Sequence, residues 1–303
     1  MSGFHPLPLL VMASFLPGCA PLRSFSEVAA SLPKEDLVAL SGQRVHVERW
    51  GHEGPHLVLL HGFAASTFSF RKLGPLLGKS HRVIAIDLNG FGFTERPTEP
   101  SAYSLEGQVA LVTAVLDQLK ICRASLVGHS FGGQIALHWA DQKPERVESL
   151  VLISPPTQLE KPPWPLRLGP VRVALYPLMR LALSRPSQFR KLISRAYHQK
   201  NLLTIEVSEA YRERLLVEGL GRAYRGFGAS LSSAPGPSPR PDQPIVVVAG
   251  RHDEVIPLED LEAFVEGLPH AHLHVLEKSG HSSPEEEPRA LARIIQDFLN
   301  GRR

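Results

Sequence analysis

A serine between two glycines follows a short apolar run near the middle of the chain. The residues Gly128-His129-Ser130-Phe131-Gly132 come directly after run 124–127, which is typical of a buried strand, and a stretch with helical spacing follows. A sharp turn from strand to helix strains the central backbone and lifts that side chain clear of the sheet, while the glycines let the two backbones pass closely. This order predicts that Ser130 is a covalent nucleophile.

The serine needs two partners, and the chain supplies both further on. A serine hydroxyl becomes a good nucleophile when a base takes its proton, and a third group holds that base in one tautomer. Asp253 ends the loop after apolar run 244–249, and His281 follows the shorter run 273–276. Both come just after predicted strands, at the sheet edge where open α/β folds place their sites. We therefore predict His281 as the general base and Asp253 as the carboxylate that orients it.

Two backbone N–H groups are expected to stabilise a developing oxyanion. The apolar strand 56–60 ends in His61-Gly62-Phe63, and a turn in that position can supply one donor. The residue after the nucleophile supplies the other. Phe63 and Phe131 are therefore the predicted oxyanion hole.

These groups require a scaffold that gathers distant segments at one edge. Runs 36–40 and 44–50 alternate as in a hairpin of edge strands. The rest of the chain up to 154 and from 244 onward alternates between strands and helices, which favours a mostly parallel sheet with helices on both faces. The predicted strands are 56–60, 82–87, 124–127, 147–154, 244–249 and 273–276, and the predicted helices are 68–77, 105–119, one after Ser130, 258–267 and 288–299.

The alternation stops between residues 155 and 240, where prolines cluster at both ends and the middle has helical spacing. An insert of this size between core strands predicts a helical lid over the site. Residues 161–225 carry thirteen lysines and arginines against four glutamates. This balance is typical of a face that attracts anionic lipid headgroups or an acidic substrate, and equally of a solvated helical surface.

Composition excludes several classes of protein. A net charge of +3 gives no signature of nucleic-acid binding, and the two cysteines, Cys19 and Cys122, do not form a disulfide framework. The sequence shows no metal-ligand spacing, so we expect no metal and no cofactor. Residues 1–25 differ from the rest, because an apolar run ends at Leu16-Pro17-Gly18-Cys19, as in a bacterial lipoprotein signal that would attach lipid at Cys19 and anchor the protein to a membrane. The alternatives are an uncleaved leader or a true start at Met12, which would leave a cytoplasmic protein.

Together these motifs resemble the α/β-hydrolase superfamily, in its capped serine hydrolase branch. The resemblance rests on segments 61–63, 87–97, 128–133, 250–253 and 280–281, in the family's order and over nearly the whole of residues 36–300. It implies a core of residues 36–154 and 244–300, with a helical cap at 155–240 inserted after the sixth strand. The motifs are specific for fold and far less specific for substrate.

The resemblance implies acyl transfer on a small-molecule substrate through an acyl-enzyme. Hydrolysis of a carboxylic ester with a small or medium apolar acyl group is the leading hypothesis, with Phe68, Phe70 and Trp164 in the substrate pocket. A serine at the elbow excludes the dehalogenase and epoxide-hydrolase branches, which use an aspartate there. Carbon–carbon bond hydrolases share the triad and usually carry tryptophan after the histidine, where this chain has Ser282. A non-catalytic ligand receptor is the third hypothesis.

Overall fold

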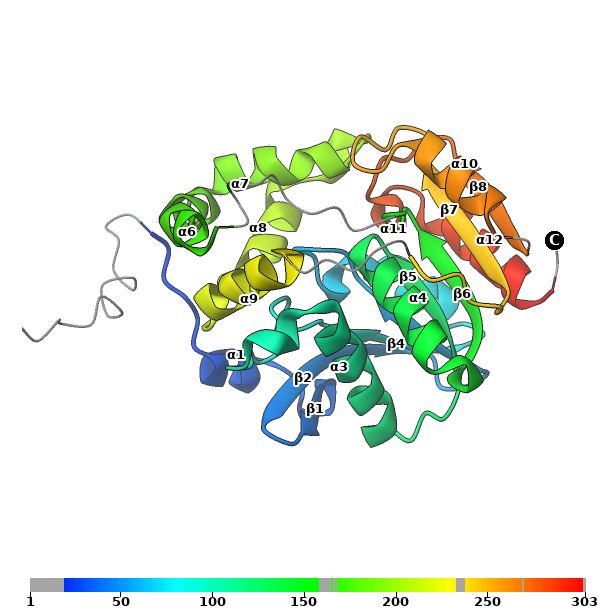
Figure 1. The fold of residues 1–303 in the computed structure, drawn as a ribbon, viewed down its shortest axis with the longest axis horizontal. Coiled ribbons are helices and arrows are strands. Elements are labelled where there is room, and N and C mark those ends of the chain that lie inside the picture. The colour runs from blue at the N-terminus through cyan, green and yellow to red at the C-terminus, as the bar shows by residue number, and fades with distance from the viewer. Residues whose placement is uncertain (1–18, 158–164, 166–167, 233–237, 269, 302–303) are drawn as a thin grey trace, which may run out of the picture.

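The computed structural model describes residues 19–157, 165, 168–232, 238–268 and 270–301 (Figure 1). Residues 1–18 of the expected leader and the expected pocket residue Trp164 lie outside these ranges. The strands are β1 Leu37–Leu40, β2 Gln43–Trp50, β3 His56–Leu60, β4 Arg82–Ile86, β5 Ala124–His129, β6 Val147–Ile153, β7 Ile245–Gly250 and β8 Ala271–Leu276. The helices are α1 Phe25–Ser31, α2 Gly74–Leu77, α3 Leu105–Gln118, α4 Phe131–Gln142, α6 Gly169–Ser184, α7 Pro186–Ile193, α8 Ile205–Leu215, α9 Leu220–Ser232, α10 Leu258–Glu266, α11 Ser283–Glu286 and α12 Pro288–Leu299. Short 3₁₀ helices are η2 Lys34–Asp36, η3 Thr67–Phe70, η4 Pro100–Tyr103, η5 Pro144–Arg146, η6 Ser194–Ala196 and η7 Lys200–Leu202.

The described strands form one sheet of eight, in the order β1-β2-β4-β3-β5-β6-β7-β8. β1 pairs antiparallel with β2, and β2 pairs antiparallel with β4. All other pairings are parallel. The mostly parallel sheet is thereby confirmed, and so is the hairpin expected at its edge.

Helices cover both faces of the sheet. Successive residues of a strand point to opposite faces, and apolar residues on both faces need to be covered. In β3, Val58 and Leu60 belong to one hydrophobic core and Leu57 and Leu59 to another. The first core includes buried residues of α3, α4 and α10, and the second includes those of α2 and α12. Burial on both faces explains why inner strands such as β3 and β7 are nearly continuous apolar runs, whereas the edge strand β8 alternates with histidines.

The segment between β6 and β7 contains α6, α7, α8 and α9, which we call the inserted helices. Figure 1 shows them gathered at one end of the molecule, next to α11. Their residues line two cavities together with the loops after β3 and β5. The inserted helices therefore form part of the walls around the candidate site.

One predicted helix is wrong in extent. The sequence predicted a single helix over 68–77, but the structure has η3 and the four-residue α2, separated by a turn. Gly74 and Pro75 begin α2. Pro75 has no backbone N–H to donate to the preceding turn, and proline disfavours helical geometry in the residue before it. The apolar pattern over 68–77 therefore does not form one continuous helix.

Candidate active site

Ser130 lies at the junction where β5 ends and α4 begins. Its φ of 51° and ψ of −120° lie in a region that non-glycine residues seldom adopt and that costs on the order of 1–3 kcal/mol. The backbone N–H of Ser130 donates to the carbonyl of Ile153 in the neighbouring β6, at 2.8 Å. The strained turn predicted from the sequence is present, and the sheet itself holds it in place.

Glycine is required on both sides of this turn. A Cβ atom on Gly128 would lie 2.5 Å from the carbonyl oxygen of Gly132, and one on Gly132 would lie 2.1 Å from the carbonyl oxygen of Leu60. Real Cβ atoms do not approach backbone so closely. The two glycines therefore let α4 begin against the ends of β3 and β5.

Asp253 and His281 meet although they follow different strands. Nδ1 of His281 lies 2.8 Å from Oδ2 of Asp253, and the other oxygen, Oδ1, accepts the backbone N–H groups of Val255 and Ile256. Burial alone would raise the pKa of Asp253, but the hydrogen bond and charge of His281 and the N–H of Ile256 keep it below its ordinary value. The carboxylate therefore stays ionised and fixes the ring, and Nε2 makes no hydrogen bond to any residue that the structure describes.

Ser130 and His281 line the same cavity of about 130 Å³. No hydrogen bond joins Ser130 Oγ to the imidazole among the described residues, and in enzymes without substrate such contacts are often long. The structure thus brings the three predicted catalytic residues together: His281 contacts Asp253 and lines the same cavity as Ser130.

Of the two predicted oxyanion donors, Phe63 lines this cavity and Phe131 directly follows Ser130. Phe131 is the first residue of α4, and a Cβ on Gly62 would lie only 3.1 Å from the Cβ of Ser130, so the turn carrying Phe63 packs against the elbow. Neither the N–H of Phe63 nor that of Phe131 donates to a backbone carbonyl in the part of the chain that the structure describes. Both amides are therefore available to a ligand.

A second histidine supports the first. Nε2 of His129 lies 2.7 Å from the carbonyl oxygen of His281, and its Nδ1 is buried without a partner among the described residues. Because a carbonyl only accepts, Nε2 carries the hydrogen. Burial and the neighbouring His281 lower the pKa of His129 to about 3, so the ring is neutral at physiological pH.

This neutral His129 predicts an acid-dependent loss of stability. The unfolded chain takes up a proton on His129 below about pH 6.5 while the native state does not, so the free energy of unfolding falls as the pH falls toward 3. The contribution is about 2 kcal/mol between pH 7 and pH 5. Urea unfolding at several pH values gives the free energy of unfolding as a function of pH. Between pH 7 and pH 5 this free energy should fall less for His129→Gln than for the wild type. His272→Gln, at an exposed position on β8, should keep the wild-type dependence of this free energy on pH. The same dependence in all three proteins would contradict the conclusion that His129 is neutral in the folded state.

A buried polar cluster forms the far wall of the Ser130 cavity. The carboxylate of Glu285 accepts the hydroxyls of Tyr197, at 2.7 Å, and of Tyr211, and it pairs with Arg71. Burial raises the pKa of both tyrosines, so they remain protonated donors. Sequence reasoning missed this cluster, because Glu285 begins an acidic run that is typical of a solvated helix start.

The pocket residues predicted from the sequence are partly wrong. Phe70 is fully buried in the second hydrophobic core, and the guanidinium groups of Arg71 and Arg214 both lie over the ring of Phe68. Neither lines a described cavity around Ser130. Both lie in η3, whose sequence spacing does not show which aromatic side chains turn toward the site.

A larger apolar cavity adjoins the site, with a volume of about 450 Å³. It shares Phe63, Ala64 and Ile193 with the cavity of Ser130 and extends between the inserted helices. Among its described lining residues, Arg172 is the one with a charged side chain. The remaining walls are mainly apolar or aromatic: Phe91, Met179, Leu183, Phe189, Leu192, Leu215, Leu220, Ala223, Tyr224 and Phe227.

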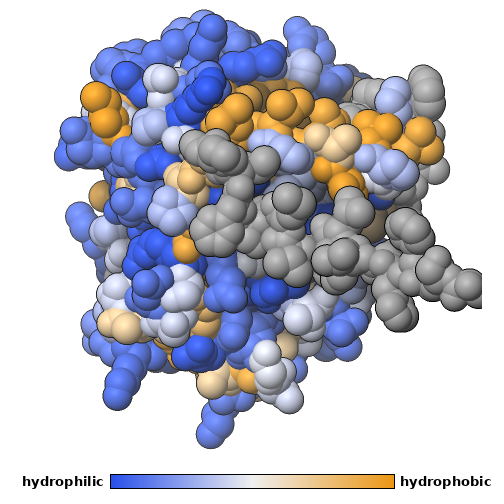
Figure 2. All heavy atoms as spheres, turned by 90° about the vertical axis from the view of Figure 1, so that its left-hand side faces the viewer, coloured by the Kyte–Doolittle hydropathy of each residue, from blue (hydrophilic) through white to orange (hydrophobic). Residues whose placement is uncertain are grey.

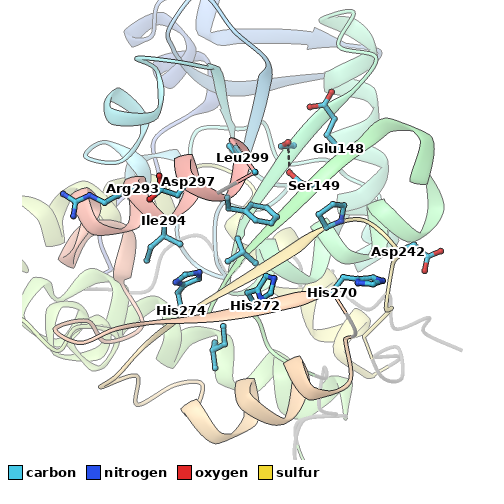
Figure 3. A pocket seen from close by; sticks show the side chains of 16 residues that line it. Glu148, Ser149, Asp242, His270, His272, His274, Arg293, Ile294, Asp297 and Leu299 are labelled. Carbon is cyan, nitrogen blue, oxygen red and sulfur yellow. Dashed lines mark hydrogen bonds between the residues drawn. The ribbon is translucent and has the colours of Figure 1, made fainter. Parts of the chain in front are cut away.

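Another hollow, of about 1160 Å³, lies away from this chemistry. Figure 3 shows His270, His272 and His274 together, with Arg293 and Asp297 of α12 across from them. Its lining comes from the beginnings of β5 to β8, whereas the catalytic candidates follow the ends of strands. No group of side chains in the described residues has the arrangement of a metal site, and none of the described helices is both long and apolar enough to cross a bilayer.

Comparisons with known proteins agree with this geometry. A family model described as the α/β hydrolase fold matches residues 55–288. The chain belongs to the α/β-hydrolase family. An uncharacterized hydrolase of Bacillus subtilis, YugF, is 30% identical over 265 residues, covering 86% of this chain and 96% of that protein.

Other relatives of this α/β hydrolase have named substrates. The 2-hydroxymuconate semialdehyde hydrolase of a Pseudomonas species is 30% identical and covers 86% of this chain and 92% of its own. The structure of a meta-cleavage product hydrolase from Pseudomonas fluorescens superposes with a TM-score of 0.70 at 25% identity, covering 88% of this chain and 97% of that one. These likenesses support hydrolase activity.

Proposed function

We propose that this α/β hydrolase cleaves carboxylic esters with an apolar acyl group, through an acyl-enzyme on Ser130. The observation that carries the proposal is the apolar cavity of about 450 Å³ that adjoins the cavity of Ser130 and His281. A cavity of this volume falls in the range of small-molecule sites. Its apolar walls favour an acyl chain, and the inserted helices act as the cap that encloses it.

The proposed mechanism has two steps. Ser130 Oγ attacks the carbonyl carbon while its proton moves to Nε2 of His281, and the N–H groups of Phe63 and Phe131 hold the oxyanion. The intermediate collapses to the acyl-enzyme, and His281 returns the proton to the leaving alcohol. Water, deprotonated by Nε2 of His281, then attacks the acyl carbonyl, and the second intermediate collapses to the acid while His281 returns the proton to Ser130 Oγ. Asp253 keeps the imidazole in the required tautomer throughout.

A series of p-nitrophenyl esters from acetate to octanoate tests the acyl preference. Burial of each methylene contributes about 0.8 kcal/mol, so kcat/KM should rise by up to about fourfold for each added carbon until the cavity is full. If kcat/KM stays constant or falls as the acyl chain lengthens, the acyl group does not bind in this cavity. No activity on any ester would remove the ester hypothesis itself.

Carbon–carbon bond hydrolysis is the second candidate, because relatives at 30% and 29% identity are named for 2-hydroxymuconate semialdehyde. Two features count against it in this chain. Ser282 follows the catalytic histidine, where those relatives usually carry tryptophan, and the cavity of Ser130 has no lysine or arginine among its described lining residues to bind a substrate carboxylate. Turnover of 2-hydroxymuconate semialdehyde above that of every ester would establish this candidate instead.

A further inference from the structure

Helix α6 presents an apolar face to the outside of the molecule. The side chains of Val173 and Leu178 are 59% and 63% exposed, and Pro170 and Ala174 are exposed on the same side. These positions recur every three to four residues, which places them on one face of the helix. Figure 2 shows apolar side chains gathered in a band across this side of the molecule.

The two charged residues of α6, Arg172 and Arg180, are not among its exposed residues. Arg180 is buried and donates to the carbonyl of Ala20, and Arg172 lines the apolar cavity. A surface helix of a globular protein normally shows the reverse pattern, with charges outward and the apolar stripe inward. An apolar face exposed in this way marks a surface that binds something.

Exposed basic residues follow directly on α7 and its connections. From Leu168 to Ile205 the sequence has seven lysines and arginines and no acidic residue. Lys191 and Arg195 are exposed in α7 and η6, and the exposed Leu192 lies beside Lys191 in the chain. An apolar helix face, followed in the chain by exposed cations in a stretch without carboxylates, matches the surface of an anionic bilayer, whose acyl region and headgroups it complements.

Two neighbouring features fit a bilayer better than another protein. Leu192 of α7, which is 60% exposed, also lines the apolar cavity, so the wall of the cavity reaches the surface on the helix that follows and contacts α6. Ala20 donates its N–H to Ser184 at the end of α6, so Cys19, where the sequence predicts lipid attachment, is tethered to this helix. We propose that the outer face of α6, with the basic residues of α7 and η6, docks on the surface of an anionic membrane and opens the apolar cavity toward it.

Flotation of the full chain with vesicles tests the proposal. Binding should be strong to phosphatidylcholine vesicles that contain phosphatidylglycerol and weak to phosphatidylcholine alone. The double variants Val173→Ser with Leu178→Ser, and Lys191→Glu with Arg195→Glu, should each weaken binding by about tenfold or more. A matched control, Lys79→Glu with Arg123→Glu, makes the same change in charge at exposed positions away from α6 and should bind like the wild type.

Circular dichroism and hydrolysis of a soluble ester should be unchanged in all these variants, since none of the substituted residues lies in the site. The proposal is overturned if the variants and the control bind alike, or if the wild type does not bind anionic vesicles. Sedimentation velocity gives the remaining outcome. If the double variant Val173→Ser with Leu178→Ser converts a dimer into a monomer without affecting vesicle binding, the outer face of α6 joins two copies of the chain and does not bind a membrane.

Discussion

Replacement of Ser130 by alanine should lower kcat on any ester substrate by at least about a thousandfold. In the proposed mechanism this hydroxyl forms the covalent bond, and among the described residues that line the cavity Ser130 is the one held in the strained turn between β5 and α4. Alanine meets the same backbone strain as serine at a φ of 51°, so the fold should be retained. Steady-state kinetics, with the thermal midpoint of unfolding measured in parallel, check this result.

Ser282→Ala is the matched control for Ser130→Ala. It removes a hydroxyl from the same cavity, next to His281, and should change kcat by less than about tenfold. A fluorophosphonate probe should label the wild type and this control on the peptide that contains Ser130. Labelling of the Ser130→Ala protein, or comparable losses of activity in the two variants, would show that the nucleophile lies elsewhere.

Replacement of Glu285 by glutamine should lower the free energy of unfolding by about 2–3 kcal/mol. The side chain of Glu285 is 3% exposed and that of Arg71 is 22% exposed, so removal of the negative charge leaves a largely buried guanidinium without its counter-ion. The two tyrosines keep an acceptor, since glutamine has one carbonyl oxygen, and this limits the loss. Urea denaturation followed by fluorescence measures the change.

The same substitution at Glu277 is the control for this effect. Glu277 also pairs with an arginine, Arg251 at 2.8 Å, but both side chains are largely exposed. Water and salt screen an exposed pair, so Glu277→Gln should cause no measurable change. Equal losses at positions 285 and 277 would mean that burial does not control the strength of these pairs.

The candidate catalytic groups could be predicted from the sequence because their signals are local. Ser130 sits in a turn whose glycines and flanking elements are contiguous, and Asp253 and His281 each come just after an apolar strand. Strands of a parallel sheet all end at the same edge, so residues placed after strand ends must converge there. The sheet, its antiparallel edge and most of its helices followed from the same periodic patterns.

The environment of those groups could not be predicted in the same way. Glu285 meets Tyr211 across 74 residues and Tyr197 across 88, and nothing near any of them in the sequence indicates the partner. The same limit applies to the expected pocket residues Phe68 and Phe70. Aromatic spacing shows that a side chain will be buried, but only the path of the backbone decides whether it faces the core or the site.

Helix α6 shows this division most clearly. Its sequence determined a helix with an apolar stripe, which by itself is typical of a face that packs against a core. In the tertiary structure Val173 and Leu178 stay exposed, whereas Arg180, two turns after Val173 on the same side of the helix, is buried where it donates to the carbonyl of Ala20. Sequence periodicity thus determined the elements and the chemistry at their ends, while the direction each face takes depended on contacts between segments far apart in the chain.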